Sequence, residues 1–218
     1  MSEYRVPTHD ARAEFVEKKS RFIGRIWVTE TEEEALDRIK QMRQQHWDAT
    51  HNVYAYAVRS PEYSRYSDAG EPQGTAGMPV LEVLRGQGLE NVCCVVTRYF
   101  GGTLLGTGGL VRAYGRAAKD AVAAAGISVQ RVWNTVDLFV PYNLYERVSK
   151  EIPRFEGQVI DTEFSADVGL HLIFPAVRTE EFLTRILDLT SGRVSGAVTG
   201  ESFRPFPLIP PADPGAAE

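Results

Sequence analysis

A glycine-rich stretch from Asn91 to Ala125 has the residue types of an anion-binding site. The apolar run Val92–Val96 predicts a buried strand, and apolar residues at helical spacing up to Ala125 predict a helix, with Gly126 as its C-terminal cap. The loop between them would present free backbone N–H groups and the positive end of a helix dipole. The basic residues of the whole stretch are Arg98, Arg112, Arg116 and Lys119, and no acidic residue lies among them.

The loop departs from both common nucleotide-binding motifs. A P-loop needs a lysine and a hydroxyl after its last glycine, whereas Gly101–Gly106 is followed by Thr107 and contains no lysine. A dinucleotide fingerprint that starts at Gly106 would have Val111 in the place of its third glycine. The sequence therefore argues against nucleotide hydrolysis. Two interpretations stay open: the glycines contact phosphate or a partner, or they only allow tight turns and close helix–sheet packing.

The expected contact surface combines this loop with the cations around it. Arg98 and Tyr99, with Phe100, could stack on bases and pair with phosphate, or could simply pack as the end of a strand. Gly115 is unusual in an alanine-rich helix, and we expect another backbone to approach it closely. The predicted binding residues for nucleic acid, phosphate or a partner are Arg98, Tyr99, Gly101, Gly102, Gly106, Thr107, Gly108, Gly109, Arg112 and Arg116.

A polar loop is predicted to flank this surface. Asp68 and Glu71 could act as a paired acid and base or bind a metal, although Asp, Gly and Pro are also ordinary turn residues. His51 precedes a predicted strand beside the loop. The flanking set is Asp68, Glu71, Gln73, Gly74, Thr75 and His51. The four histidines show no metal-ligand spacing, and we expect neither a metal nor a cofactor.

The elements that must position these residues form an α+β pattern. Ala11–Lys18 and Arg21–Val28 predict a hairpin, and a Thr31–Glu34 capping box begins a helix that runs to about His46. Asn52–Val58 predicts a third strand. Further along come a loop over Ser60–Pro79, a short helix from Pro79 that ends at Gly86–Gly88, and the glycine-rich stretch. We expect a sandwich with its helices on one side of a sheet.

The second half predicts a different fold. Strands, helices and strands follow in the order β-α-β-β-α-β, which is the ferredoxin-like arrangement. The expected domains are 1–127 and 128–204, followed by a proline-rich tail over 205–218.

Composition sets limits on the class of protein. The formal net charge is -5, so any nucleic-acid contact must be a local basic patch. No apolar run approaches the roughly 18 residues that span a bilayer, and the N-terminus does not resemble a secretory signal, so we expect a cytoplasmic protein. Cys93 and Cys94 are adjacent in a predicted buried strand and should point to opposite faces as core residues.

Four motifs follow one another along the chain: KKSRFI from Lys18, DATHNVYAY from Asp48, Ser67–Pro79, and VVTRYFGG from Val95 with LGTGGLVRAYG from Leu105. Together they resemble the IMPACT family, and in particular its bacterial YigZ-type branch. The resemblance covers Ala11 to about Ala125, and the second half is similar to the C-terminal domain of bacterial members. It implies an N-terminal domain like the second domain of ribosomal protein S5 and domain IV of elongation factor G. It also implies a C-terminal domain like domain V of that factor.

The resemblance also directs the functional hypothesis. Eukaryotic members regulate translation initiation by competing for an activator of an initiation-factor kinase, a circuit that bacteria lack, and the resemblance implies no catalytic residue. We therefore expect a non-catalytic, translation-associated regulator that binds RNA, the ribosome or a ribosome-associated protein. A pure protein-interaction adaptor is a further possibility. The alternative is an enzyme that acts on a phosphorylated small molecule with Asp68, Glu71 and His51. No oligomeric state is predicted.

Overall fold

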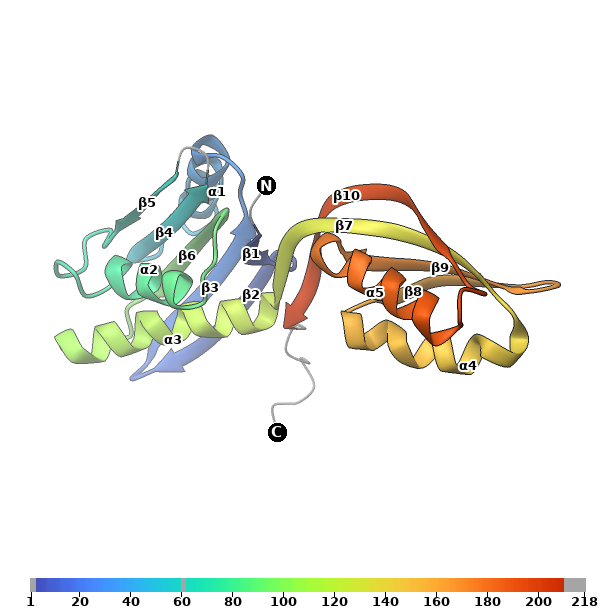
Figure 1. Cartoon of the computed structure of the whole chain (residues 1–218). Coiled ribbons are helices and arrows are strands. Elements are labelled where there is room, and N and C mark those ends of the chain that lie inside the picture. Colours follow the sequence, from blue (N-terminus) through green and yellow to red (C-terminus); the bar gives the residue numbers. More distant parts are fainter. Residues whose placement is uncertain (1–2, 60–61, 210–218) are drawn as a thin grey trace. The chain divides into compact units, whose positions relative to one another are not determined.

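Two β-sheets, each with its own helices, make up the α+β fold of the chain (Figure 1). The structure is a computed structural model that describes residues 3–59 and 62–209. Contacts divide the chain into two units, one containing Tyr4–Val129 and the other Gln130–Arg204. The α+β class and the presence of two sheets agree with the expectation from sequence.

The sheet of the Tyr4–Val129 unit is antiparallel, with a strand buried on both faces at its centre. Its order is β2-β3-β6-β4-β5, and every residue of the central strand from Val92 to Arg98 is buried. A strand covered on both sides reads as a continuous apolar run, which is why Val92–Val96 could be recognised from sequence. The strands are β2 (Ala11–Glu17), β3 (Ser20–Val28), β4 (His51–Arg59), β5 (Glu62–Ser67) and β6 (Val92–Tyr99).

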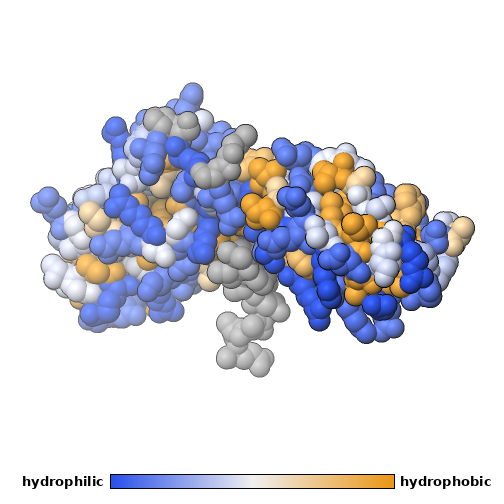
Figure 2. Space-filling model, in the orientation of Figure 1, coloured by the Kyte–Doolittle hydropathy of each residue, from blue (hydrophilic) through white to orange (hydrophobic). Residues whose placement is uncertain are grey.

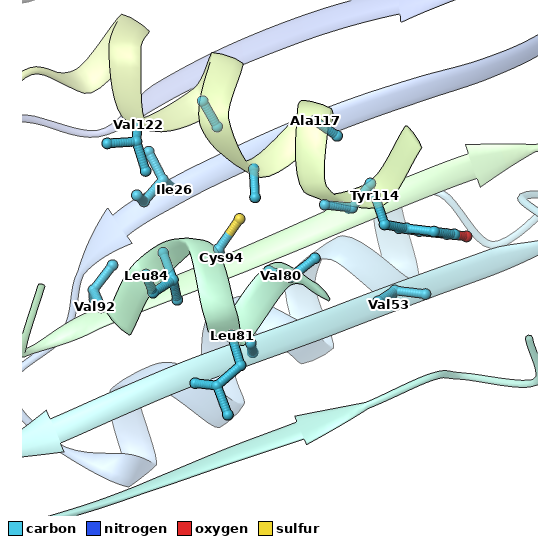
Figure 3. Packing of buried hydrophobic residues seen from close by; sticks show 14 of the residues in the cluster. Ile26, Val53, Val80, Leu81, Leu84, Val92, Cys94, Tyr114, Ala117 and Val122 are labelled. Carbon is cyan, nitrogen blue, oxygen red and sulfur yellow. The ribbon is translucent and has the colours of Figure 1, made fainter. Parts of the chain in front are cut away.

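Helices cover both faces of this sheet, so the expectation of helices on one side was wrong. Helices α2 (Gly77–Gly86) and α3 (Thr107–Ala125) pack on one face (Figure 3), whereas α1 (Glu32–Gln45) packs on the other (Figure 1). The adjacent cysteines reflect this arrangement. Cys94 packs beneath α2 and α3, and Cys93 packs against α1, as predicted. Both are free, and burial raises the pKa of Cys94 to about 12.

The helix termini follow their capping residues. The Thr31 side chain accepts a hydrogen bond from Glu34 N at 3.2 Å, and Glu34 in turn accepts from Glu30 N at 2.8 Å. Helix α3 begins at Thr107 and ends at Ala125, and Gly126, whose φ of 68° suits glycine, caps it. Gly108 and Gly109 therefore lie in the first helical turn rather than in the loop.

Glycine allows a close helix–sheet contact, but not where the sequence suggested it. A Cβ atom at Gly115 would meet nothing within 4 Å, so the expected close approach there was wrong. The approach occurs at Gly24 on β3, where a Cβ would lie 2.5 Å from the carbonyl oxygen of Ala117 on α3. The helix can pack this near the sheet only because the strand residue lacks a side chain.

Two strands were not predicted from sequence. Strand β1 (Tyr4–Pro7) precedes the hairpin, and β5 occupies part of the stretch that was expected to be a loop over Ser60–Pro79. Strand β5 is an edge strand of sequence EYSRYS, and its polar, mostly exposed residues give no apolar alternation to recognise.

The Gln130–Arg204 unit has the predicted β-α-β-β-α-β order. Strand β7 pairs with both β9 and β10, and β8 lies beside β9. Val148 of α4 and Phe182 of α5 belong to its core. Strand β10 continues to Ile209, so residues 205–209 are strand rather than tail, while residues 210–218 lie outside the described residues. The elements are β7 (Ile127–Val140), α4 (Tyr142–Glu151), the 3-10 helix η1 (Ile152–Phe155), β8 (Gln158–Phe164), β9 (Val168–Pro175), α5 (Ala176–Leu189) and β10 (Gly196–Ile209).

Candidate functional site

Arg98 lies inside the Tyr4–Val129 unit rather than on its surface. The strand register places it on β6 directly between Phe22 of β3 and His51 of β4. Only 4% of the residue is exposed. Its guanidinium carbon lies 5.4 Å from the ring centroids of both Phe22 and Phe100. The structure thus gives Arg98 two aromatic neighbours, of which Phe100 but not Phe22 was expected beside it, and it leaves Arg98 without free access to a phosphate group.

Glu71 neutralises this buried cation. Arg98 donates from Nη1 to Glu71 Oε1 at 2.6 Å and from Nη2 to Ser20 Oγ at 3.2 Å. Tyr114 of α3 donates its hydroxyl to the same carboxylate oxygen at 2.7 Å. Burial, and then this hydrogen bond, raise the pKa of Tyr114, so the phenol stays protonated. Buried charges normally require such a partner together with additional hydrogen bonds.

His51 lies beside these four residues, Ser20, Glu71, Arg98 and Tyr114, which we call the Glu71 network. Its Nδ1 lies 2.9 Å from the carbonyl oxygen of Ala69, and its Nε2 lies 3.7 Å from Glu71 Oε1. Because a carbonyl only accepts, Nδ1 must carry the proton of the neutral ring, which leaves a lone pair on Nε2. The second distance is too long for a hydrogen bond.

Tyr99 belongs to the opposite face of the sheet and does not join the glycine-rich loop. Its hydroxyl lies 2.8 Å from His46 Nδ1 and donates to Asp48 Oδ1 at 3.2 Å, at the end of α1. Successive strand residues point to opposite faces, so a site that combined both Arg98 and Tyr99 was not possible once they shared β6.

The polar loop is largely held together by its own hydrogen bonds. Asp68 accepts from the backbone N–H groups of Gly74, Ala76 and Gly77 at 2.8–3.1 Å, so its carboxylate is a loop staple. Thr75 is buried, and its hydroxyl donates to Pro72 O at 2.7 Å. Gln73 is exposed. Of the six flanking residues predicted from sequence, the structure brings Glu71 and His51 together and leaves Asp68 outside their network.

The glycine-rich loop joins β6 to an uncapped helix start. Gly102 and Gly106 have φ values of 82° and 73°, which favour glycine. No side chain of the described residues caps α3, and its first turn has no acidic residue. The N–H groups of Thr107, Gly108 and Gly109 therefore have no partner within the helix. Gly101, by contrast, packs against the backbone of Lys19, so any side chain there would collide with the β2–β3 hairpin.

One pocket connects the Glu71 network with the glycine-rich loop. We call it the Glu71 pocket, and it has a volume of about 400 Å³. Its polar side consists of His51, Glu71 and Arg98, and the start of α3 contributes Gly106 and Thr107. The apolar lining comes from Pro72, Phe100, Leu104, Leu105 and Leu110.

A second cleft, here called the basic cleft, lies on the other side of Leu105. It has a volume of about 240 Å³, and Lys18, Arg112 and Arg116 line it together with Glu17 and Phe15. Sequence reasoning missed Lys18 as a site residue. The sequence did contain a signal, because two lysines occupy a tight hairpin turn where glycine or asparagine is usual. In the structure, Lys18 and Lys19 form this turn with positive φ values of 44° and 66°.

The cations of the basic cleft differ in how they are balanced. Arg116 lies 3.4 Å from Asp120 and stacks on Phe15 at 4.2 Å. Lys18 and Arg112 are exposed and have no acidic partner within 4.0 Å among the described residues. Figure 2 shows hydrophilic and apolar residues side by side where α3 runs along this unit in Figure 1. An exposed, unbalanced pair of cations beside free N–H groups suits a phosphate.

Within residues 3–59 and 62–209, no three His, Cys, Asp or Glu side chains gather in a way that could hold a metal ion. In the same ranges, no helix has the length and apolar character needed to cross a membrane.

Comparison with known proteins places both halves of the chain. Residues 18–122 match the family described as Impact N-terminal domain, and residues 138–193 match a domain of unknown function, DUF1949. The chain is 35% identical over 181 residues to the IMPACT family member YvyE of Bacillus subtilis, a match that covers 83% of each chain. It is 35% identical over 178 residues to the IMPACT family member YigZ of Escherichia coli, covering 80% of this chain and 87% of that one. A crystal structure of a hypothetical protein, at 31% identity, aligns with a TM-score of 0.58 over 92% of this chain and 98% of its own.

Proposed function

The chain belongs to the IMPACT family, and we propose that it is a non-catalytic, translation-associated regulator that binds RNA, the ribosome or a ribosome-associated protein. The proposal includes a cytoplasmic setting. The contact surface is the exposed part of the glycine-rich segment with the basic cleft. Its members are Gly102, Gly106, Thr107, Gly108, Gly109, Arg112 and Arg116 from the surface predicted by sequence, together with Lys18. Arg98 and Gly101 lie beneath this surface, whereas Tyr99 lies on the opposite face of the sheet.

The observation that carries the proposal is the position of Lys18 and Arg112 beside the uncapped start of α3. The Arg112 guanidinium folds back toward the first turn, where its Nη1 would lie 3.6 Å from a Cβ at Gly108. Backbone N–H groups, a helix dipole and guanidinium and ammonium groups therefore converge on one exposed place. In a chain of net charge -5, such a local concentration of positive charge favours a polyanion.

We expect the double substitution Arg112→Gln with Arg116→Gln to weaken co-sedimentation with ribosomes and binding to RNA. The slope of log affinity against log salt should fall by about 2, because each arginine that contacts a phosphate contributes about 1. Arg98 is not chosen, because its loss would leave Glu71 buried without a partner.

The matched control is Lys40→Gln with Arg43→Gln on α1. It removes the same charge from exposed residues of the same unit. It should leave binding nearly unchanged. A folded Arg112/Arg116 variant that still co-sediments like the wild type across the salt series would refute the proposed surface. Binding that survives nuclease treatment would assign the contact to a protein partner rather than to RNA.

The Glu71 pocket favours a second candidate function, an enzyme that acts on a phosphorylated small molecule. His51 and Glu71 share this pocket with Gly106 and Thr107, as that hypothesis requires. Asp68, however, holds the loop through three backbone hydrogen bonds and does not line the pocket. An enzyme would therefore have to work with His51 and Glu71 alone. Turnover of a phosphorylated metabolite that is lost in His51→Phe would support this candidate.

A further inference from the structure

We infer that the Glu71 pocket binds one unpaired RNA base that carries an exocyclic amino group. This inference rests on the proposed function, since it specifies how the same surface would recognise RNA. It goes further because it separates a base-reading pocket from the phosphate-binding basic cleft beside it.

The pocket offers hydrogen-bond acceptors that lack donors. Glu71 Oε1 accepts hydrogen bonds from Arg98 and Tyr114. No hydrogen bond or ion pair within residues 3–59 and 62–209 involves the other carboxylate oxygen, Oε2. The Glu71 side chain is 4% exposed, and Oε2 is not among the fully buried atoms without a partner, so a ligand in the pocket can reach it. His51 adds the lone pair on Nε2, because its Nδ1 donates to Ala69. A ligand that fits this pocket must therefore supply N–H donors.

An exocyclic amino group of a base matches these acceptors. An amino-bearing base such as adenine or cytosine presents an amino group beside a ring nitrogen that accepts. The two N–H bonds of that amino group can donate to the carboxylate and imidazole acceptors, as donors of a base commonly do to protein side chains.

The remaining walls suit a flat ring. Phe100 is 45% exposed and lines the pocket, and it provides an aromatic face on which a base can stack. Leu104, which is 81% exposed, and Leu110 add apolar contacts. The volume of about 400 Å³ lies in the range of small-ligand sites, roughly 300–1,000 Å³.

The surroundings favour RNA over a basic protein segment. A lysine or arginine side chain would also supply N–H donors, but it would have to lie beside Lys18, Arg112 and Arg116. Leu105 lines both the Glu71 pocket and the basic cleft, so the two cavities are neighbours. A base in the first would place its adjoining phosphate toward the cations of the second and the N–H groups of α3.

The test compares oligonucleotides that differ by one amino group. Fluorescence anisotropy measures the binding of the wild-type chain to an oligouridine with one central adenine, and to the same strand with purine in its place. Both carry the same phosphates. We expect the adenine strand to bind about tenfold more tightly, as for one hydrogen bond to a charged group, with equal salt dependence.

Two variants assign the effect to the pocket without breaking the buried ion pair. Phe100→Ala should weaken binding of the adenine strand about tenfold, and His51→Phe should remove most of the difference between the strands. The double variant Arg112→Gln with Arg116→Gln should weaken the binding of both strands by the same factor.

Equal affinity of the wild type for both strands would overturn the base pocket, while the proposed function would still stand if the arginine variant binds them weakly. Adenosine monophosphate that binds as tightly as the adenine strand would also overturn it, because the pocket would then serve a free nucleotide. If neither strand binds, RNA is not the partner, and the base pocket and the RNA part of the proposed function fail together.

Discussion

Arg98 illustrates how one residue can have the right chemistry and the wrong accessibility for a predicted role. A cation between two aromatic rings is what base and phosphate recognition would use. Phe100 is one of the two aromatic residues expected beside Arg98, whereas Phe22 takes the place expected for Tyr99. Its partner Glu71, however, is 27 positions away. Only the folded sheet, which places Arg98 beside His51 and under α3, determines that a buried carboxylate of the same unit neutralises its charge.

We expect Arg98→Met to lower the free energy of unfolding by about 3–5 kcal/mol, because it leaves Glu71 buried without its cation. Tyr114→Phe should cost about 1.5–3 kcal/mol, since one hydrogen bond to the carboxylate is lost. Urea unfolding followed by circular dichroism measures both. The exposed substitution Arg112→Met is the control and should change stability by less than about 0.5 kcal/mol. A loss below 1 kcal/mol for Arg98→Met would show that the pair is not an essential structural contact.

At the scale of elements, sequence patterns identified most of the fold. The β2–β3 hairpin, α1 with its capping box, the buried β6 and the long α3 all follow from local periodicity and terminal residues. Strand β5 escaped recognition because an exposed edge strand has no apolar face to alternate. The position of α1 could not be predicted either, because an amphipathic helix reveals that one face is buried but not which side of the sheet covers it.

The candidate site was predictable in composition but not in arrangement. The glycine-rich loop, its cations and the polar loop were all recognised, yet their grouping was only partly right. Tyr99 lies on the other face of the sheet, Asp68 is a loop staple, and Lys18 comes from a hairpin more than 80 positions earlier. Such relations depend on strand register and on long-range contacts, which no local pattern encodes.

Glycines at Gly24 and Gly115 provide a matched pair of substitutions on two packed elements. Gly24→Ala should destabilise the protein by about 1–3 kcal/mol, because the new Cβ would lie 2.5 Å from the Ala117 carbonyl oxygen and force α3 to shift. Gly115→Ala should stabilise it by about 0.5–1 kcal/mol, because alanine favours the helix and nothing lies within 4 Å. Thermal unfolding distinguishes the two. Destabilisation by Gly115→Ala would instead point to a contact that the fold does not contain.

At the scale of the whole molecule, each of the two units has its own core. Each also contains a histidine with a shifted pKa, and the two shifts have opposite directions. Burial, with Arg25 as a further cause, lowers the pKa of His46 in the Tyr4–Val129 unit. A hydrogen bond to Asp137, at 2.8 Å, raises the pKa of His171 in the Gln130–Arg204 unit. Protonation therefore opposes folding in the first unit and favours it in the second.

We expect the stabilities of the two units to change in opposite directions with pH. Below the ordinary histidine value of 6.5, the unit with His46 should lose stability as the unfolded chain takes up a proton. His171 should contribute fully below 6.5, and its contribution should disappear as the pH rises through its raised pKa. Hydrogen exchange in β3 and β9, corrected for intrinsic rates, measures each unit separately.

The controls for the pH experiment are the neutral variants. His46→Gln should flatten the pH dependence in β3 alone, and His171→Gln should flatten it in β9 alone. Carboxylates whose pKa is lowered, such as Glu151, change charge below pH 4.5 and so do not titrate in the pH range of the two histidines. Parallel changes in both units would contradict the assignment to these two histidines.

The Glu71 network has a consequence for the order in which the chain assembles. Its hydrogen bonds join residues separated by 27, 43 and 78 positions, so all four segments must be in place before the charges can pair. Contacts of this separation generally form late, after the strands and helices have met. The ion pair should therefore mainly slow unfolding. Weakening it would raise the unfolding rate and shorten the lifetime of the native state, while the folding rate would stay almost unchanged.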